Sequence, residues 1–202
     1  MKLLPLSIAV SGILAVSAAV AADAPATLNS VKAGEYVVDP YHTQIGFTLS
    51  HFGFTNYTGL FSGGTGSLRL DPAHPAASHL AITIPVQSLV TTVPKLTDEL
   101  KGDKWFDSTK FPQATFESTS ISVAANGEAT ITGNLTLHGV TRPVVLHAHL
   151  VGAGVNPIDH QYTVGFQASG TIKRTDFGVS LYAPAVGDDV QLSIAGAFEL
   201  KG

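Results

Sequence analysis

The stretch that decides the fold runs from Tyr36 to Asp71 and reads YVVDPYHTQIGFTLSHFGFTNYTGLFSGGTGSLRLD. Along its first half apolar and polar residues alternate, so that Ile45, Phe47 and Leu49 are separated by single residues. Alternation with a period of two predicts a β-strand with one apolar and one polar face. Five glycines then follow between positions 53 and 66, and glycine at this density is typical of turns, bulges and sharp bends. The stretch predicts the opening of an antiparallel sheet that curls.

Most of the remaining chain alternates in the same way. Apolar residues recur at every second position in further runs within 80–86 and 113–198, and turn signals such as Asn126-Gly127 separate the runs. Runs of this length, about eight in number, predict strands joined mostly by hairpins, and hairpins make a sheet antiparallel. Because only closure removes the unpaired edges of such a sheet, we expect an all-β fold made of a single antiparallel eight-stranded barrel.

One segment departs from the alternation. Residues 94–107 read PKLTDELKGDKWFD, in which Leu96 and Leu100 lie four residues apart and Trp105 and Phe106 follow. A spacing of four places two side chains on one face of an α-helix. We therefore expect a short helical insertion at about residues 94–107. If the barrel holds a ligand, this insertion is the natural lid.

The N-terminus predicts export. An uncharged apolar run follows the second residue and ends in small residues, with Val20 and Ala22 at the two positions expected before a cleavage site. The alternative is an uncleaved membrane anchor, because the run approaches the roughly 20 residues that span a bilayer. The expected organisation is a signal peptide at 1–22 that is removed, a mobile leader at 23–34 and one barrel domain at 35–202.

Charge and cysteine content exclude several classes of function. Removal of Lys2 with the signal peptide leaves 10 basic residues against 15 acidic residues, a net charge of −5, and the chain has no basic cluster. This balance argues against nucleic acid and anionic lipid headgroups as electrostatic partners. The chain has no cysteine, which excludes disulfides, zinc thiolates and thiol nucleophiles.

Small residues on the expected inner face bear on whether the barrel is hollow. Gly133 and Ala148 share that face with large residues such as Phe47, and small residues either let strands coil tightly or leave space. A composition of 45% hydrophobic and 13% charged residues favours an apolar cavity for an apolar ligand. By strand parity, the residues expected to line it are Ile45, Phe47, Leu49, His51, Phe116, Leu135, Leu137, Phe166, Leu192 and Ile194.

Few polar residues are candidates for chemistry. His51 falls on the apolar face, where it is either a hydrogen-bonded core residue or the contact for a ligand's polar end. His147 and His149 share the opposite face of their strand, which favours surface residues over metal ligands. Arg174 and Asp176 could form a structural pair or meet a headgroup. The chain contains no Gly-x-Ser-x-Gly, His-Glu-x-x-His or glycine-rich phosphate motif, so we expect no catalytic residue, no metal and no cofactor.

Four blocks occur in series: DPYHTQIGFTLSHFGFTNYTGLF, WFDSTKFPQATFESTS, GNLTLHGVTRPVVL and DFGVSLYAPAVGDDVQLSIAGAFEL. They resemble the YceI-like polyisoprenoid-binding family, over Gly34 to Leu200. The resemblance implies a lipocalin-like antiparallel barrel that is usually exported to the bacterial periplasm. It also implies an elongated apolar tunnel that holds a polyprenyl chain, a quinone tail or another fatty amphiphile, with dimers common and no established enzymatic activity.

The chain departs from the family pattern at two places. Gly64 follows Phe61 where relatives tend to have a second aromatic residue, which predicts a wider pocket near Gly64. Residues 96–100 read LTDEL where relatives often have Arg-Asp-x-His-Leu, so a headgroup contact by that arginine or histidine is not expected here.

The resemblance and the residues together predict a periplasmic carrier, serving transport or sequestration of an isoprenoid or similar long-chain lipid. The expected partners are this amphiphile, a transient membrane or membrane-protein contact and a second copy of the chain, with no nucleic acid. Two alternatives stay open. A partner-binding barrel without ligand would have a solid core, and a lipid isomerase or cyclase would need two titratable groups in the cavity, where parity supplies His51 alone.

Overall fold

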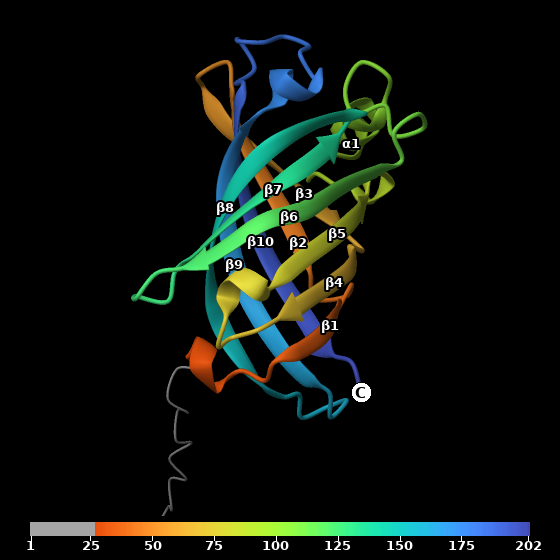
Figure 1. The fold of residues 1–202 in the computed structure, drawn as a ribbon. Helices are drawn as coiled ribbons and strands as arrows, with labels where there is room; N and C mark the ends of the chain where they lie inside the picture. The colour runs from red at the N-terminus through yellow and green to blue at the C-terminus, as the bar shows by residue number, and fades with distance from the viewer. Residues whose placement is uncertain (1–26) are drawn as a thin grey trace, which may run out of the picture.

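The computed structural model describes residues 27–202, so the predicted signal peptide at 1–22 lies outside the described residues. These residues form ten antiparallel strands and one α-helix (Figure 1). The strands are β1 (Gly34–Val38), β2 (Gln44–His51), β3 (Thr55–Ser62), β4 (Thr65–Leu70), β5 (His79–Pro85), β6 (Gln113–Val123), β7 (Ala129–Leu137), β8 (Val140–Val155), β9 (Tyr162–Lys173) and β10 (Asp189–Leu200), and the helix is α1 (Pro94–Lys101).

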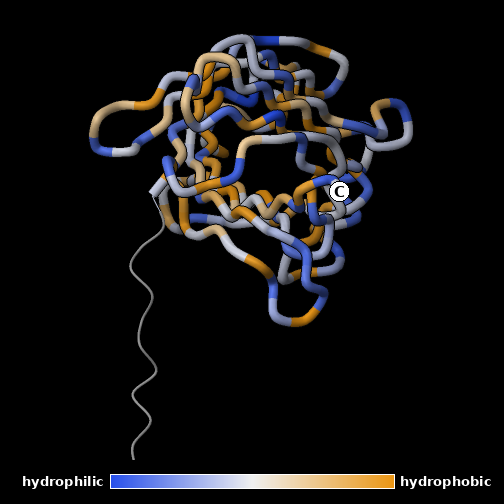
Figure 2. Tube along the Cα trace, turned by 60° about the horizontal axis from the view of Figure 1, so that its bottom comes forward, coloured by the Kyte–Doolittle hydropathy of each residue, from blue (hydrophilic) through white to orange (hydrophobic). Residues whose placement is uncertain are grey.

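The strands close into a barrel of eight, as predicted. Neighbouring strands follow the order β1-β4-β5-β6-β7-β8-β9-β10, and β1 pairs with β10 to complete the ring. The other two strands extend this ring, because β2 continues along β10 beyond β1 and β3 pairs with β2. Figure 2 views the ring toward one end and shows hydrophobic and hydrophilic residues alternating along the strands. The period of two in the sequence thus corresponds to an inward and an outward face.

A bend separates β1 from β2 on the same partner strand. Val38 pairs with Phe198 and Gln44 with Ala195, so the five residues 39–43 face only two residues of β10. Thr43 restores the interrupted ladder: its hydroxyl accepts from the Ala197 N–H at 3.0 Å and donates to the Ala197 carbonyl at 3.2 Å. Extra residues on one strand are the defining feature of a bulge, which bends the sheet. This bend lies before the glycines at positions 53 to 66, where the sequence predicted turns and bends.

The interior divides into two halves along the barrel axis. One hydrophobic cluster lies near α1 and includes Phe47, Phe116 and Phe177. The other includes Tyr36, Val164 and Phe198 and lies at the end that carries β1 and the C-terminus (Figure 1). We call these the α1 half and the closed half.

The helical insertion is shorter than predicted, and of its four predicted apolar residues two are buried while Leu96 and Phe106 are partly buried. The α-helix ends at Lys101, and turns continue to residue 106. Leu100 and Trp105 are buried in the α1 half. None of the helices among the described residues is long and apolar enough to cross a membrane.

The described part of the predicted leader packs against the closed half. Val31 is buried in that cluster, and the hydroxyl of the fully buried Tyr36 donates to the Lys32 carbonyl at 2.6 Å. Burial, together with the nearby Tyr162, raises the pKa of Tyr36 to about 12. Residues 31–36 are therefore packed against the barrel, and β1 begins at Gly34, one residue before the predicted start of the domain.

Candidate functional site

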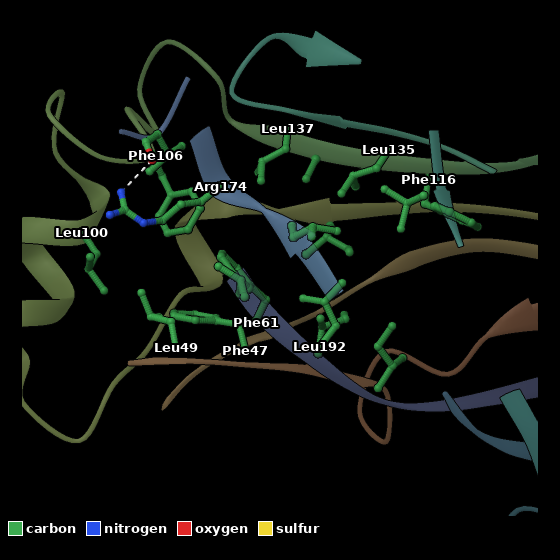
Figure 3. A pocket seen from close by; sticks show the side chains of 18 of the residues that line it. Phe47, Leu49, Phe61, Leu100, Phe106, Phe116, Leu135, Leu137, Arg174 and Leu192 are labelled. Carbon is green, nitrogen blue, oxygen red and sulfur yellow. Dashed lines mark hydrogen bonds between the residues drawn. The ribbon is translucent and has the colours of Figure 1, made fainter. Parts of the chain in front are cut away.

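The α1 half of the barrel contains a cavity of about 150 Å³. Its walls come from β2, β3, β6, β7 and β10 and from neighbouring strands, and Trp105 of the helical insertion also lines it. Leu100 and Phe106 of the insertion lie at one end (Figure 3). Every lining residue is apolar except Arg174. A concave apolar site with one polar group is the usual form of a small-molecule binding site.

Strand parity identified much of this lining. Of the ten residues predicted to line a cavity, those that do so are Ile45, Phe47, Leu49, Phe116, Leu135, Leu137, Leu192 and Ile194. Their contact with a ligand stays a prediction.

His51 does not line the cavity. Its parity matches that of Leu49, but β2 ends at His51 and the chain turns through residues 52–54 toward β3. The side chain is exposed and packs edge-to-face against Phe52, with ring centroids 4.4 Å apart. Parity alone gives a side chain's face and not the point at which its strand passes the rim of the barrel.

Phe166 also lies outside the cavity. It belongs to the hydrophobic cluster of the closed half, where its ring meets that of Phe198 at a centroid distance of 6.2 Å. Phe166 is paired with Gly196 of β10, and other large residues of the same cluster fill the barrel at this level. An inward residue therefore lines a cavity only where the interior is not packed solid.

Several lining residues were not among the ten predicted from strand parity, although Leu100, Trp105 and Phe106 belong to the predicted lid. Some were left out although they lie on apolar strand faces, and others lie in segments without a strand period, where alternation gives no signal. The additional lining residues are Phe61, Ile84, Leu100, Trp105, Phe106, Ala114, Val144, Leu146, Ile172, Arg174, Val179 and Val190. Phe61 could have been found by pairing β2 with β3, since it lies directly opposite Ile45.

Two glycines make room for aromatic rings at the wall. A Cβ atom at Gly59 would collide with the ring of Phe47, and one at Gly133 would collide with the ring of Phe116. Each ring therefore lies over the backbone of a neighbouring strand. Absence of a side chain in a strand is often explained by such a close approach. Gly133 was expected either to let strands coil or to leave space, and here its space holds a ring.

Three phenylalanines form a cluster between the barrel wall and the insertion. The ring centroids of Phe47 and Phe61 lie 5.6 Å apart, those of Phe61 and Phe106 lie 5.5 Å apart, and those of Phe47 and Phe106 lie 6.3 Å apart. Edge-to-face and tilted arrangements at these distances are favourable for aromatic pairs. The cluster connects the lid to the wall.

Arg174 is the one charged residue beside the cavity, and it lines the wall with the carbon atoms of its side chain. Its side chain is buried, with 5% exposure, and donates to three carbonyls: Nε to Gly187 at 2.9 Å, Nη1 to Val179 at 2.7 Å and Nη2 to Val186 at 2.7 Å. Its guanidinium also lies 5.6 Å from the centre of the Trp105 ring. Burial lowers the pKa of Arg174, and the charge of Asp188 opposes this shift.

The possible pair of Arg174 with Asp176 is not formed. Among the ion pairs within the described residues, none involves Arg174. Asp188, which acts on Arg174 at longer range, instead accepts hydrogen bonds from the Thr175 backbone N–H at 3.0 Å and hydroxyl at 2.9 Å. Of the two interpretations of Arg174, the structural pair is therefore wrong.

The histidines do not converge on a metal site. His147 and His149 are exposed on the outer face of β8, as their parity predicted. Within residues 27–202, no three His, Cys, Asp or Glu side chains gather closely enough to hold a metal ion.

Comparison with known proteins agrees with this geometry. A family model described as a YceI-like domain matches residues 36–198. A UPF0312 protein of Shewanella oneidensis is 33% identical over 167 residues, which cover 82% of this chain and 87% of that protein. A UPF0312 protein of Yersinia pestis is 36% identical over 171 residues, covering 84% of this chain and 88% of that protein.

Solved structures share the fold. BcnA of Burkholderia cenocepacia has a TM-score of 0.71 and 26% identity, over 79% of this chain and 98% of that chain. A polyisoprenoid binding domain from Saccharophagus degradans has a TM-score of 0.60, over 84% of this chain and 100% of that chain, and at 15% identity it shows the fold alone. The closed eight-stranded barrel, its apolar cavity and the match over residues 36–198 all agree: this chain belongs to the YceI-like family.

Proposed function

We propose that this protein binds and carries an isoprenoid, such as a polyprenyl or quinone-type lipid, or a similar long-chain amphiphile. The observation that carries the proposal is the cavity in the α1 half, whose walls are apolar apart from Arg174. Binding there would be driven by burial of apolar surface, worth roughly 25 cal/mol per Å² before the loss of ligand freedom. The fold shared with a polyisoprenoid binding domain of Saccharophagus degradans supports the same class of ligand.

The size of the cavity limits how much of a long chain it encloses. An apolar cavity of about 150 Å³ is large enough for a guest of the size of benzene. One segment of a polyprenyl chain therefore fills it. The rest of the chain leaves past the insertion or displaces partly buried lining residues, such as Phe61 of the wall, whose ring contacts Phe106 of the insertion.

The lining favours a carrier over an isomerase or cyclase. Acid–base catalysis on a lipid needs groups that give and take protons within the cavity. Arg174 is the single ionisable residue in the lining, and a guanidinium stays protonated in proteins. We therefore expect binding without chemical turnover.

The alternative of a partner-binding barrel without ligand predicts a packed interior. The closed half is packed in this way, whereas the α1 half is hollow. The proposal of a carrier rests on the hollow half, and homodimerisation stays a prediction.

We also propose that the protein works in the periplasm and touches a membrane when it loads. Aromatic side chains are exposed at the α1 half of the barrel: Phe54 is 87% exposed, Tyr182 59% and Phe52 46%. Phe52 and Tyr182 have positive φ angles of 54° and 60°, a conformation that bulky residues rarely adopt. Their two loops are joined by a hydrogen bond from the Phe52 N–H to the Ala185 carbonyl at 2.9 Å. Exposed aromatic side chains suit the interface between lipid and water.

The chain provides its own reporter for the binding test. Trp105 is the one tryptophan in the sequence, and it lines the cavity. Titration of delipidated protein with geranylgeraniol should change the Trp105 emission in a saturable way with one site per chain. A titration with glycerol, which lacks the apolar chain, is the control. Emission that stays unchanged, together with no ligand retained on gel filtration, would refute the carrier proposal.

A further inference from the structure

We propose that a long-chain ligand leaves the cavity sideways, between β3 and the connection at residues 86–93, and that its projecting part binds an apolar strip on the outer surface. We call this boundary the seam, and the outer strip consists of Leu60, Val90 and Val93. The inference rests on the proposed function, because it names where the part of an isoprenoid chain that the cavity does not enclose is bound. Three observations carry it: the hydrogen bonding of β3, the apolar side chains on both faces of the seam and the size of the cavity.

β3 is paired along its whole length on one edge only. There, residues 55–62 pair with residues 44–51 of β2. On the other edge, Leu60 and Val90 exchange two backbone hydrogen bonds of 2.9 Å, and the Ser62 N–H donates to the Ser88 hydroxyl at 3.1 Å. The wall at the seam is therefore closed by three hydrogen bonds in place of a continuous ladder.

The first half of β3 has a free backbone edge. Backbone groups of alternate residues in an antiparallel strand point to the same side, so those of Asn56 and Thr58 point the same way as those of Leu60. Within the part of the chain that the structure describes, Asn56 and Thr58 have no backbone partner on this side, and both residues are exposed. Regions with few hydrogen bonds and contacts open at a low cost in free energy. The seam can therefore widen from this end without the loss of a ladder.

The inner face of the seam adjoins the cavity. Phe61 of β3 lines the cavity and is partly buried, and Ile84 of β5, close to the start of the connection, lines it as well. Leu89 of the connection is fully buried in the same hydrophobic cluster. Phe61 and Leu89 thus present apolar groups to a chain that approaches the seam from the cavity.

The outer face of the seam is also apolar. Leu60 and Val90 lie directly opposite each other, and such residues of an antiparallel pair share a face. Leu60 is 38% exposed and Val90 50%, while Val93, the residue before α1, is 47% exposed. Because Leu60 and Phe61 are neighbours on opposite faces of β3, the apolar lining of the cavity continues through the seam to the outer surface.

The length of the ligand provides the occupant of the outer strip. A cavity of about 150 Å³ encloses a guest of the size of benzene, so most of a geranylgeranyl chain lies outside it. Apolar surface beside the exit removes part of that chain from water, which is favourable. At the end covered by the insertion, Leu100 and Trp105 are buried, so an exit there requires their displacement. The seam requires the displacement of the partly buried Phe61.

The first test locks the seam with a disulfide. Because the chain has no cysteine, the double variant Leu60→Cys/Val90→Cys has a single possible disulfide. Residues that exchange two backbone hydrogen bonds have Cα atoms about 5.5 Å apart, which suits a disulfide. Stopped-flow Trp105 emission measures the rate of geranylgeraniol uptake by the oxidised and the reduced form. We expect oxidation to slow uptake at least about 10-fold and reduction to restore it, as for binding that requires an opening.

The matched control locks two strands that are already paired. Thr48 and Thr58 lie opposite each other on β2 and β3, and their hydroxyls are 2.9 Å apart. Oxidation of Thr48→Cys/Thr58→Cys should leave the seam free and uptake unchanged. Equal uptake by both forms of Leu60→Cys/Val90→Cys, or equal slowing in the control, would overturn the seam and leave the carrier proposal standing. Failure of the unaltered protein to bind geranylgeraniol would overturn both.

The second test examines the outer strip and leaves the backbone bonds of the seam in place. In Val90→Asp a projecting chain would have to cover a charged group, which costs free energy. We expect geranylgeraniol to bind at least about fourfold more weakly, the value of one buried methylene, and the shorter geraniol to change by less than about twofold. Val145→Asp is the matched control, since Val145 is 45% exposed on β8, which is not a neighbour of β3. Equal affinities of the two variants for geranylgeraniol, or an equal loss for geraniol, would overturn the outer strip.

Discussion

At the residue scale, the open interior depends on where side chains are missing. Phe47 and Phe116 could fill the α1 half, yet their rings lie over Gly59 and Gly133 at the wall. A methyl group at either glycine would push the ring away from the wall. The cavity thus depends on positions that themselves carry no side chain.

This account predicts the effect of Gly59→Ala. The new methyl group would force Phe47 toward the lumen, which should weaken ligand binding and destabilise the fold by about 1–3 kcal/mol, as overpacking does. Gly152→Ala is the matched control, since nothing lies within 4 Å of a Cβ atom there. Urea unfolding and Trp105 titration of both variants measure the two effects. Unchanged stability and ligand binding in Gly59→Ala would show that the Phe47 ring moves aside without a loss of free energy, and would contradict this account.

A second prediction tests which face of β7 lines the cavity. Leu135 lies in the lining and its neighbour Asn134 is exposed. Leu135→Trp adds volume to a cavity of about 150 Å³ and should lower affinity for geranylgeraniol by about 10-fold or more. Asn134→Trp adds the same ring outside and should leave affinity unchanged. Because both variants add a tryptophan, binding is measured by retention of radiolabelled ligand. Equal affinity in both folded variants would contradict the assigned faces.

At the element scale, the bend at residues 39–43 connects β1 to β2. Both strands pair with β10, β1 in the closed half and β2 in the α1 half. The bend is held by one backbone hydrogen bond, from the Asp39 N–H to the Ala197 carbonyl at 2.9 Å, and by side-chain hydrogen bonds. Thr43 bonds to Ala197, and the Asp39 carboxylate accepts from the backbone N–H groups of Tyr41 and His42.

Removal of the Thr43 hydroxyl should therefore destabilise the barrel. Thr43 is buried, and Thr43→Val leaves the Ala197 N–H without its partner, while the Ala197 carbonyl keeps the hydrogen bond from the Asp39 N–H at 2.9 Å. We expect a loss of about 1–2 kcal/mol in the free energy of unfolding. The control is Thr48→Val, whose hydroxyl bonds only to the hydroxyl of Thr58 at an exposed position. Calorimetry or urea unfolding that finds equal losses would show that the bend does not depend on Thr43.

The same bend predicts a dependence of stability on pH. The hydrogen bond to Asp39 and its negative charge raise the pKa of His42 in the folded state. Burial alone would raise the pKa of Asp39, but hydrogen bonds from His42 and from the Tyr41 N–H outweigh it and lower the pKa. The His42 contribution is present below its unfolded pKa of 6.5 and is lost as pH rises through the folded value. The Asp39 contribution is present above 3.8 and is lost as pH falls through its folded value.

The pair should therefore stabilise the fold most between about pH 4 and pH 6.5. His42→Gln should lower the Tm more at pH 5.5 than at pH 8.5, and the difference should be small because His42 is exposed. His149→Gln, on the outer face of β8, is the control. A Tm loss in His42→Gln that is the same at both pH values would contradict the pairing.

At the scale of the whole molecule, the barrel is packed in its closed half and hollow in its α1 half. Strand periodicity predicted the ring of eight strands and the inward face, since a period of two directly reports the two faces of a sheet. It could not predict how far along the axis the interior is filled. For this reason Phe166, which lies in the packed half, was wrongly assigned to the cavity. Nor could it predict that β2 ends at His51, at the edge of the barrel, so that the His51 side chain lies outside the cavity.

The segments without periodicity held the rest of the site. Arg174 and Val179 reach the cavity from a connection between β9 and β10, where side-chain direction follows from tertiary contacts. The three carbonyls that hold Arg174 are backbone groups, and a sequence pattern does not show where backbone groups converge. The local sequence at 174–176 suggested an ion pair, whereas the folded loop provides carbonyls.

The central claim is that the hollow half carries a long-chain lipid, and native mass spectrometry of the protein purified from its own host tests it most directly. Organic extraction of the same sample then identifies any bound species. The account predicts one bound molecule per chain, with the mass of a polyprenyl or quinone-type lipid or a similar amphiphile. A protein that is purified empty and that also fails to take up added isoprenoids would contradict the account and favour a barrel that binds a protein partner.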